Sequence, residues 1–263
     1  MGLCDIYGNE IQTGGTGGSS QSELQRKFSG KNIIWLGDSV HAYIWPDGVT
    51  IPYLFQNDSK AKCYNWCQGG MTMALMGVAN YDPYSGVGMV DALISGNFTA
   101  QETYANDDHG TKNGNFLQEV AEMKSFDMSK AHTIIIEFGT NDCWKLVTPD
   151  NSDNKFDTTT TGGALRYMIK TLQTKYPKLN IAVCNVQRMT GFADSEHTKP
   201  YDSTVQNEVI KSVCDEYCVP LIDIGGELGI NEYTLNTLGD VHRTHAGKIK
   251  QVQLIDNRLV QLF

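Results

Sequence analysis

Ser39 stands at the end of an apolar stretch that breaks abruptly. Ile33–Leu36 is followed by Gly37-Asp38-Ser39, which predicts a buried strand running into a glycine turn with a hydroxyl at its tip. A serine hydroxyl becomes a good nucleophile when a neighbouring imidazole removes its proton, so such a site would also need a histidine. Asp and Ser are equally typical of helix N-caps. The turn by itself therefore leaves two interpretations open, a nucleophile or a cap.

Three further stretches combine glycine with polar residues that could do chemistry. They are Asn65-Trp-Cys-Gln-Gly-Gly-Met-Thr72, Gly139-Thr-Asn-Asp142 and Gly239-Asp-Val-His242. The first two follow apolar runs, and the third precedes the last predicted helix. In an open parallel sheet, ligands bind outside the carboxyl ends of the strands. We therefore expect these stretches and Ser39 at one edge of a sheet.

The elements that would position these stretches alternate along the chain. Short apolar runs at 33–36, 63–67, 133–138, 181–186 and 220–224 are the predicted strands. Between the third and fourth comes a helical pattern that ends at Tyr176-Pro177, and we infer two more helices nearer the C-terminus. Strands that alternate with helices predict a parallel sheet with helices on both sides.

The predicted helices have recognisable caps and apolar faces. Ser203 to Gln206 is interpreted as a capping box, and Thr244 as the N-cap of the last helix. The residues expected to face the core are Ala164, Leu165, Met168, Ile169 and Leu172, then Val205, Val209, Ile210 and Val213, and finally Ile249, Val252, Ile255 and Leu259.

The four glycine-containing stretches resemble, in chain order, the four blocks of the SGNH, or GDSL, hydrolase family, and the resemblance runs from about residue 31 to the end. It implies Ser39 as nucleophile and His242 as its base. It also implies an oxyanion hole made by the backbone N–H groups of Ser39 and Gly70 and the side-chain amide of Asn141. The implied fold is a three-layer α/β/α sandwich around a flavodoxin-like, five-stranded parallel sheet. The implied activity is ester hydrolysis through an acyl-serine, with no metal or organic cofactor.

One position departs from the family pattern. The third member of the family's triad is usually an Asp three residues before the His, where this chain has Gly239. We expect the displaced Asp240 to orient the imidazole of His242. The alternative is a backbone carbonyl in that role, which would leave a Ser–His dyad. The Pro that follows the His in the family is replaced by Arg243.

Other polar residues near the predicted strand ends are candidates for contact with substrate. His41 is expected to line the mouth of the site or to pack there. Gln187 and Arg188 follow the fourth strand, although a surface ion pair is an equally good interpretation of Arg188. His245 falls in the first turn of the last helix and is interpreted as a helix residue, not a metal ligand.

The cysteines and one acidic segment raise the question of metals. Seven cysteines cannot all pair within one chain, and we expect free thiols. The spacings of Cys63 and Cys67, and of Cys214 and Cys218, suit zinc poorly. The segment 150–157 spaces oxygens as calcium sites do, but it lacks the central Gly and terminal Glu of an EF-hand loop. A solvated turn is the better interpretation, and no metal site is predicted.

Composition and charge limit the partners. The 263-residue chain has a formal charge of −9, which argues against nucleic acid or an anionic membrane as partner and favours a neutral substrate. No apolar run approaches the length of a membrane span, and the N-terminus lacks the features of a signal peptide. We expect a soluble protein, cytoplasmic or associated with a virion or cell surface without classical secretion.

The chain divides into residues 1–30, an appendage with a Gly/Ser-rich linker, and residues 31–263, the hydrolase domain. The appendage is either an attachment to a larger assembly or a remnant of a longer protein. The irregular segments 71–127 and 144–161 are expected to set specificity, and the Tyr and Asn residues of the first favour a sugar-like leaving group. Resemblance to SGNH modules of phage tails and cell-surface proteins implies a small ester or an acetylated surface polysaccharide as substrate. The alternative is an inactive glycan-binding or structural module, and the oligomeric state is not predicted.

Overall fold

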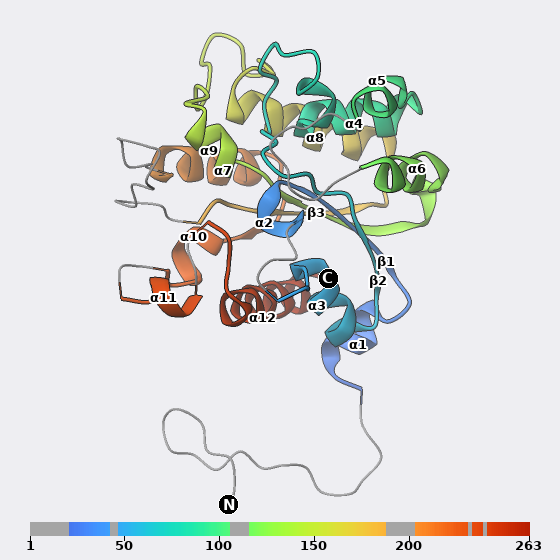
Figure 1. Ribbon diagram of the computed structural model, residues 1–263, viewed down its shortest axis with the longest axis vertical. Helices are drawn as coiled ribbons and strands as arrows, with labels where there is room; N and C mark the ends of the chain where they lie inside the picture. Colours follow the sequence, from blue (N-terminus) through green and yellow to red (C-terminus); the bar gives the residue numbers. More distant parts are fainter. Residues whose placement is uncertain (1–20, 43–46, 106–115, 188–202, 231–232, 239–240) are drawn as a thin grey trace, which may run out of the picture.

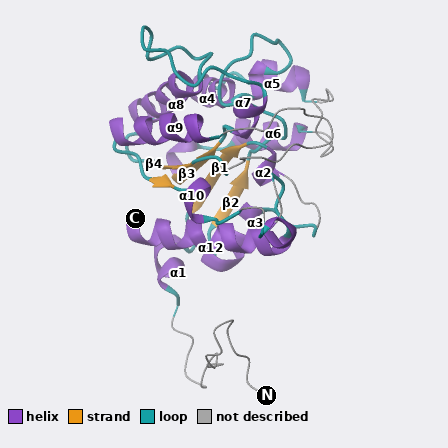
Figure 2. Cartoon of the chain, turned by 90° about the vertical axis from the view of Figure 1, so that its left-hand side faces the viewer, coloured by secondary structure: helices purple, strands orange, loops and turns teal. Residues whose placement is uncertain are grey.

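A five-stranded, all-parallel sheet forms the centre of the molecule (Figures 1 and 2). The computed structural model describes residues 21–42, 47–105, 116–187, 203–230, 233–238 and 241–263. The strand order is β2-β1-β3-β4-β5, which confirms the predicted flavodoxin-like sheet. The strands are β1 (Asn32–Gly37), β2 (Lys62–Asn65), β3 (Ala131–Glu137), β4 (Asn180–Cys184) and β5 (Leu221–Ile222).

Helices cover both faces of the sheet, as the α/β/α prediction requires (Figure 1). One layer contains α4 (Gly86–Ser95), α5 (Thr99–Tyr104), α6 (Leu117–Ser125), α7 (Thr140–Trp144), α8 (Thr161–Lys175) and α9 (Thr204–Glu216). The other contains α1 (Glu23–Phe28), α3 (Ile51–Ser59), α10 (Ile224–Glu227), α11 (Leu235–Leu238) and α12 (His245–Leu262). The short α2 (Ser39–Ala42) follows β1, and single 3-10 turns lie at Asp82–Tyr84 and Met128–Lys130.

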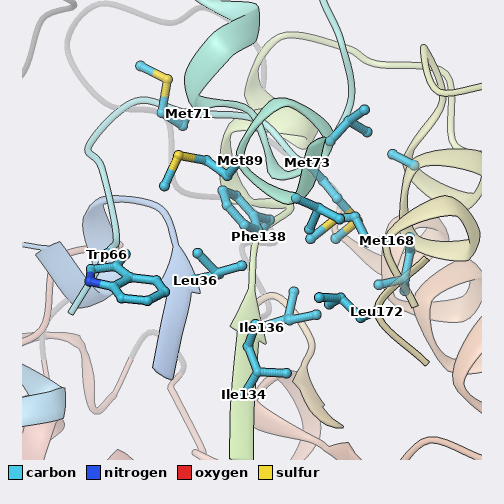
Figure 3. Packing of buried hydrophobic residues seen from close by; sticks show 14 of the residues in the cluster. Leu36, Trp66, Met71, Met73, Met89, Ile134, Ile136, Phe138, Met168 and Leu172 are labelled. Carbon is cyan, nitrogen blue, oxygen red and sulfur yellow. The ribbon is translucent and has the colours of Figure 1, made fainter. Parts of the chain in front are cut away.

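The central strands are apolar on both faces because both faces are covered. Ile34 and Leu36 of β1 join the core under α4 and α8, whereas Ile33 and Trp35 point into the core under α3 and α12. Figure 3 shows the first core, where Leu36 and two isoleucines of β3 meet Phe138 and several methionines. A strand buried on both faces reads as a continuous apolar run, which is why β1 and β3 were recognisable in the sequence.

The folded domain begins earlier than the sequence indicates. Leu24 and Phe28 of α1 are buried in the core against α3 and α12, and Gln25 donates from Nε2 to the Asp58 carbonyl at 3.1 Å. The predicted boundary between residues 30 and 31 is therefore wrong, since a six-residue helix is too short to show its period. Residues 1–20, with most of the Gly/Ser-rich stretch, lie outside the described residues.

The helix caps were predicted with mixed success. Thr244 caps α12 as expected, because its Oγ1 accepts from the Gly247 N–H at 3.2 Å. Ser203 does not form the predicted capping box: its hydroxyl donates to the Gln187 carbonyl at 3.0 Å instead. Val205 and Ile249, both expected in the core, are 47% and 38% exposed.

Within the described residues, no helix is both long and apolar enough to cross a membrane.

Candidate active site

Ser39 lies directly after β1, at the carboxyl edge of the sheet. A Cβ on Gly37 would come within 2.5 Å of the Glu137 carbonyl oxygen on neighbouring β3, so only glycine fits there. The Asp38 N–H then donates to that same carbonyl at 3.2 Å, and α2 begins at Ser39. The close contact between the strands therefore fixes where the chain turns and where the hydroxyl emerges.

His242 reaches Ser39 from the other end of the chain. It precedes α12, and its Nε2 lies 3.0 Å from Ser39 Oγ. This distance suits transfer of the hydroxyl proton to the imidazole. The two residues that the family resemblance assigned to nucleophile and base are thus in direct contact. Asp240, the expected orienting acid, lies outside the described residues, and its role stays a prediction.

Gly70 lies in the loop that follows β2. Its φ of +74° is in the left-handed region, which favours glycine over other residues. The Tyr81 hydroxyl donates to the Gly70 carbonyl, so the peptide there has a fixed orientation. In the next loop segment, the Met71 carbonyl accepts from Asn141 Nδ2 at 2.9 Å. An amide nitrogen carries two hydrogens, and this bond uses one of them. The loop after β2, which carries Gly70, is therefore bonded to α7, which carries Asn141.

Asp142, also in α7, fastens the same loop. Its carboxylate accepts from the backbone N–H groups of Met73, at 2.7 Å, and Ala74, at 3.1 Å. Burial raises the pKa of Asp142 to about 6, and the two backbone bonds oppose that rise. The sequence prediction gave Asp142 no role, although the residue belongs to the stretch Gly139-Thr-Asn-Asp142.

Asp38, beside the nucleophile, carries a perturbed carboxyl group. It is fully buried, and burial raises its pKa to about 8, reinforced by the negative charges of Glu137 and Asp142. Its Oδ1 accepts from the Val40 N–H at 3.0 Å, while its Oδ2 has no hydrogen-bond partner among the described residues. A buried ionised oxygen without a partner would be costly. Both burial and the unpartnered oxygen therefore favour the neutral form of the Asp38 carboxyl.

His41 does not line the mouth of the site. Its side chain is fully buried, with Nε2 2.9 Å from Glu137 Oε2 and the ring edge-to-face on Trp35 at 5.0 Å. The prediction of substrate contact is wrong for His41, because the carboxylate holds the ring inside the protein. The sequence also allowed His41 to pack beside the site, and this is what the structure shows.

The two candidates after β4 have different outcomes. Gln187 is only 3% exposed, and neither polar atom of its amide has a hydrogen-bond partner within the described parts of the chain. Contact between Gln187 and substrate stays a prediction. Arg188 lies outside the described residues.

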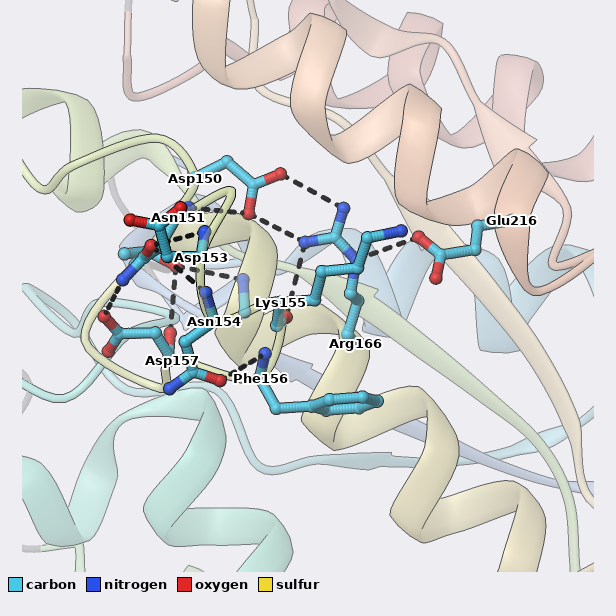
Figure 4. Close-up of polar contacts among 11 residues, drawn as sticks. Asp150, Asn151, Asp153, Asn154, Lys155, Phe156, Asp157, Arg166 and Glu216 are labelled. Atoms are coloured by element: carbon cyan, nitrogen blue, oxygen red, sulfur yellow. Dashed lines mark hydrogen bonds and ion pairs between the residues drawn. The ribbon is translucent and has the colours of Figure 1, made fainter.

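The segment considered for calcium is held by protein groups. Asp150 pairs with Arg166 at 2.7 Å, and Asp157 accepts from Asn151 at 2.8 Å, as Figure 4 shows. The described residues contain no cluster of His, Cys, Asp and Glu that could hold a metal, and their cysteines are free thiols. His245 opens α12 and pairs with Asp47.

Comparisons with known proteins agree with this geometry. Residues 58–248, more than half of the chain, match the GDSL-like lipase/acylhydrolase family. The match begins after Ser39, so the assignment of the nucleophile depends on the contact with His242. Among curated proteins, no sequence matches the chain.

Several solved structures share the fold. A protein from Lactobacillus plantarum is 18% identical with a TM-score of 0.64, over 89% of this chain and 99% of its own. A protein from Bacteroides ovatus assigned to the GDSL-like lipases has 16% identity and a TM-score of 0.54, covering 89% and 99%. The lipase/acylhydrolase from Enterococcus faecalis has 16% identity and a TM-score of 0.53, covering 88% and 96%.

Proposed function

This chain belongs to the GDSL-like lipase/acylhydrolase family, and we propose that it hydrolyses carboxylic esters through an acyl-serine intermediate. The observation that carries the proposal is the 3.0 Å contact between Ser39 Oγ and His242 Nε2. Ser39 attacks the ester carbonyl carbon while its proton passes to Nε2. The alcohol then leaves with that proton, and a water molecule, deprotonated by the same nitrogen, releases the carboxylic acid.

The negative charge that develops on the carbonyl oxygen needs fixed donors. The proposed donors are the backbone N–H groups of Ser39 and Gly70 and the amide of Asn141. Gly70 is oriented by Tyr81, and Asn141 is anchored to the Met71 carbonyl. Donors held in this way cost no reorganisation during the reaction, and each typically contributes about 2.7–4 kcal/mol to catalysis.

The proposed substrate is a small neutral ester, and more specifically an acetyl group on a surface polysaccharide. The formal charge of −9 supports a neutral substrate. The aromatic residues of segment 71–127 are weaker support for a sugar substrate. Three of them, Tyr84, Phe98 and Phe116, are buried in the core and do not face a substrate. Attachment to a phage tail or cell surface through residues 1–30 belongs to the same proposal.

A panel of p-nitrophenyl esters from acetate to octanoate, assayed beside acetylated glycans, tests this proposal. We expect turnover that is fastest with acetate and is lost in Ser39→Ala. Ser59→Ala is the control, because Ser59 is a buried serine as well but lies at the end of α3. Glycan binding without turnover of any ester would instead identify a module that keeps the fold and has lost the activity.

A further inference from the structure

A second cluster of polar residues adjoins the turns that carry Ser39 and His242. Its members are His41, Glu137, Arg243 and Gln251, none of which is more than 2% exposed. They come from α2, the end of β3, the residue after His242, and α12. Buried polar groups are expensive unless they are bonded, so the contacts within the cluster show what it holds in place.

Arg243 bonds to the main chain next to the catalytic histidine. Its Nη1 donates to the Val241 carbonyl at 2.7 Å, and its Nε donates to Gln251 Oε1 at 3.1 Å. Val241 and Arg243 flank His242. The guanidinium thus closes a short loop of backbone around the histidine and ties it to α12.

Glu137 bonds to the segment next to Ser39, as Arg243 does to the segment next to His242. Its carboxylate accepts from Gln251 Nε2 at 2.9 Å and 3.2 Å, and it lies 2.9 Å from His41 Nε2. His41 is two residues after Ser39, and the Glu137 carbonyl accepts from the Asp38 N–H. The Ser39 turn is therefore held by both the backbone and the side chain of Glu137.

Gln251 joins the two halves, because its amide accepts from Arg243 and donates to Glu137. The contacts of Glu137 also favour its charged form, which strengthens its hydrogen bonds. Burial acts to raise the pKa of Glu137, but His41, Arg243 and Gln251 together outweigh burial and keep the pKa below its usual value. Glu137 is therefore ionised, and the positive charge of Arg243 balances it inside the protein.

We propose that Arg243 and Gln251 are positioning residues, which hold the His242 imidazole at reacting distance from Ser39 through Glu137 and His41. The inference deepens the proposed esterase function and rests on it. Buried charges are weak evidence for stability, since apolar replacements often serve as well. Catalysis is more demanding, because a misplacement of about 1 Å can cost about 10²-fold in rate.

The test compares two buried arginines. Arg243→Met should lower kcat for p-nitrophenyl acetate by about 10²-fold and leave KM nearly unchanged. Arg166→Met is the matched control. Arg166 is 4% exposed and pairs with Asp150 and Glu216 away from the site (Figure 4). It should lose stability while kcat of the folded protein stays at the wild-type value.

Two further variants keep the test decisive if Arg243→Met folds poorly. Arg243→Lys should recover part of the lost rate, because the charge remains but the two-pronged geometry does not. Gln251→Met should lower kcat as Arg243→Met does. The double variant should be no slower than the slower single variant, because both changes break one chain of bonds. The rate of labelling by a fluorophosphonate should fall in parallel.

Folded Arg243→Met and Gln251→Met proteins with kcat within about twofold of wild type would overturn the inference, as would additive losses in the double variant. Equal loss of kcat in Arg166→Met would also overturn it, by showing a general effect of destabilisation. Absence of turnover in the wild-type protein is a different result. It would remove the proposed function and, with it, any positioning role.

Discussion

At the scale of single residues, the site shows which roles a motif can reveal. Ser39, Gly70, Asn141 and His242 could be predicted as candidates from the sequence because each belongs to a short stretch with glycine. Asp142 was missed, because its bonds go to the backbone of Met73 and Ala74, and no local pattern reveals a partner almost 70 residues away. For His41 the sequence left two positions open, and its contact with Glu137 shows that the packed one is correct.

The oxyanion hole gives the prediction at this scale. Asn141→Ala removes the only side-chain donor proposed for the oxyanion, so kcat should fall by about 10²–10³-fold while KM stays nearly unchanged. Steady-state kinetics with p-nitrophenyl acetate measure both constants. Asn32→Ala is the control, because Asn32 lies at the start of β1, at the opposite end of that strand from Ser39, where its amide donates to the Lys130 carbonyl. A rise in KM at constant kcat would show that Asn141 binds the substrate instead.

At the scale of elements, the sheet was predictable and the short helices were not. The strands β1 and β3 are continuous apolar runs, and the apolar period of α8 spans several turns. By contrast, α1 has six residues and gave no periodic signal, although Phe28 is fully buried. The loop after β2 has little regular structure. It is held by side chains from α7 and by Tyr81, which only the three-dimensional contacts disclose.

Two tyrosines test whether that loop supports catalysis. Tyr81 and Tyr84 each donate a hydroxyl hydrogen bond to a backbone carbonyl, of Gly70 and Gln101 respectively. Replacing either with Phe should cost about 0.5–1.5 kcal/mol of stability.

Only Tyr81→Phe should also lower kcat, because only Tyr81 bonds to the loop that carries Gly70. We expect a loss of roughly 10-fold, which is smaller than the loss of about 10²-fold that a misplacement of about 1 Å can cause. Thermal unfolding and ester kinetics on both variants separate the two effects. Equal kcat values in the two variants would mean that Tyr81 supports the fold alone.

At the scale of the whole molecule, the active site imposes a pH dependence on folding. Asp38 has a pKa of about 8 in the folded protein, because it is fully buried, against about 3.9 in an unfolded chain. Between these values the folded state holds a proton that the unfolded chain has released. Stability from this group is therefore complete at low pH and is lost as the pH rises towards 8.

Asp38→Asn should remove this dependence while keeping the shape of a neutral carboxyl. As pH rises from about 5 to about 7.5, the unfolding free energy of the wild type should fall relative to that of the variant. The change approaches about 1.4 kcal/mol per pH unit. Urea denaturation across that range measures it. Parallel curves for the two proteins would show that Asp38 is already ionised in the folded state.

The central claim is that Ser39 is a nucleophile activated by His242, and the covalent adduct tests it most directly. The protein is treated with a fluorophosphonate, digested, and mapped by mass spectrometry. The 3.0 Å contact with His242 Nε2 predicts one adduct, on Ser39, which is absent in Ser39→Ala. Labelling of a different residue, or unchanged labelling in Ser39→Ala, would contradict the account.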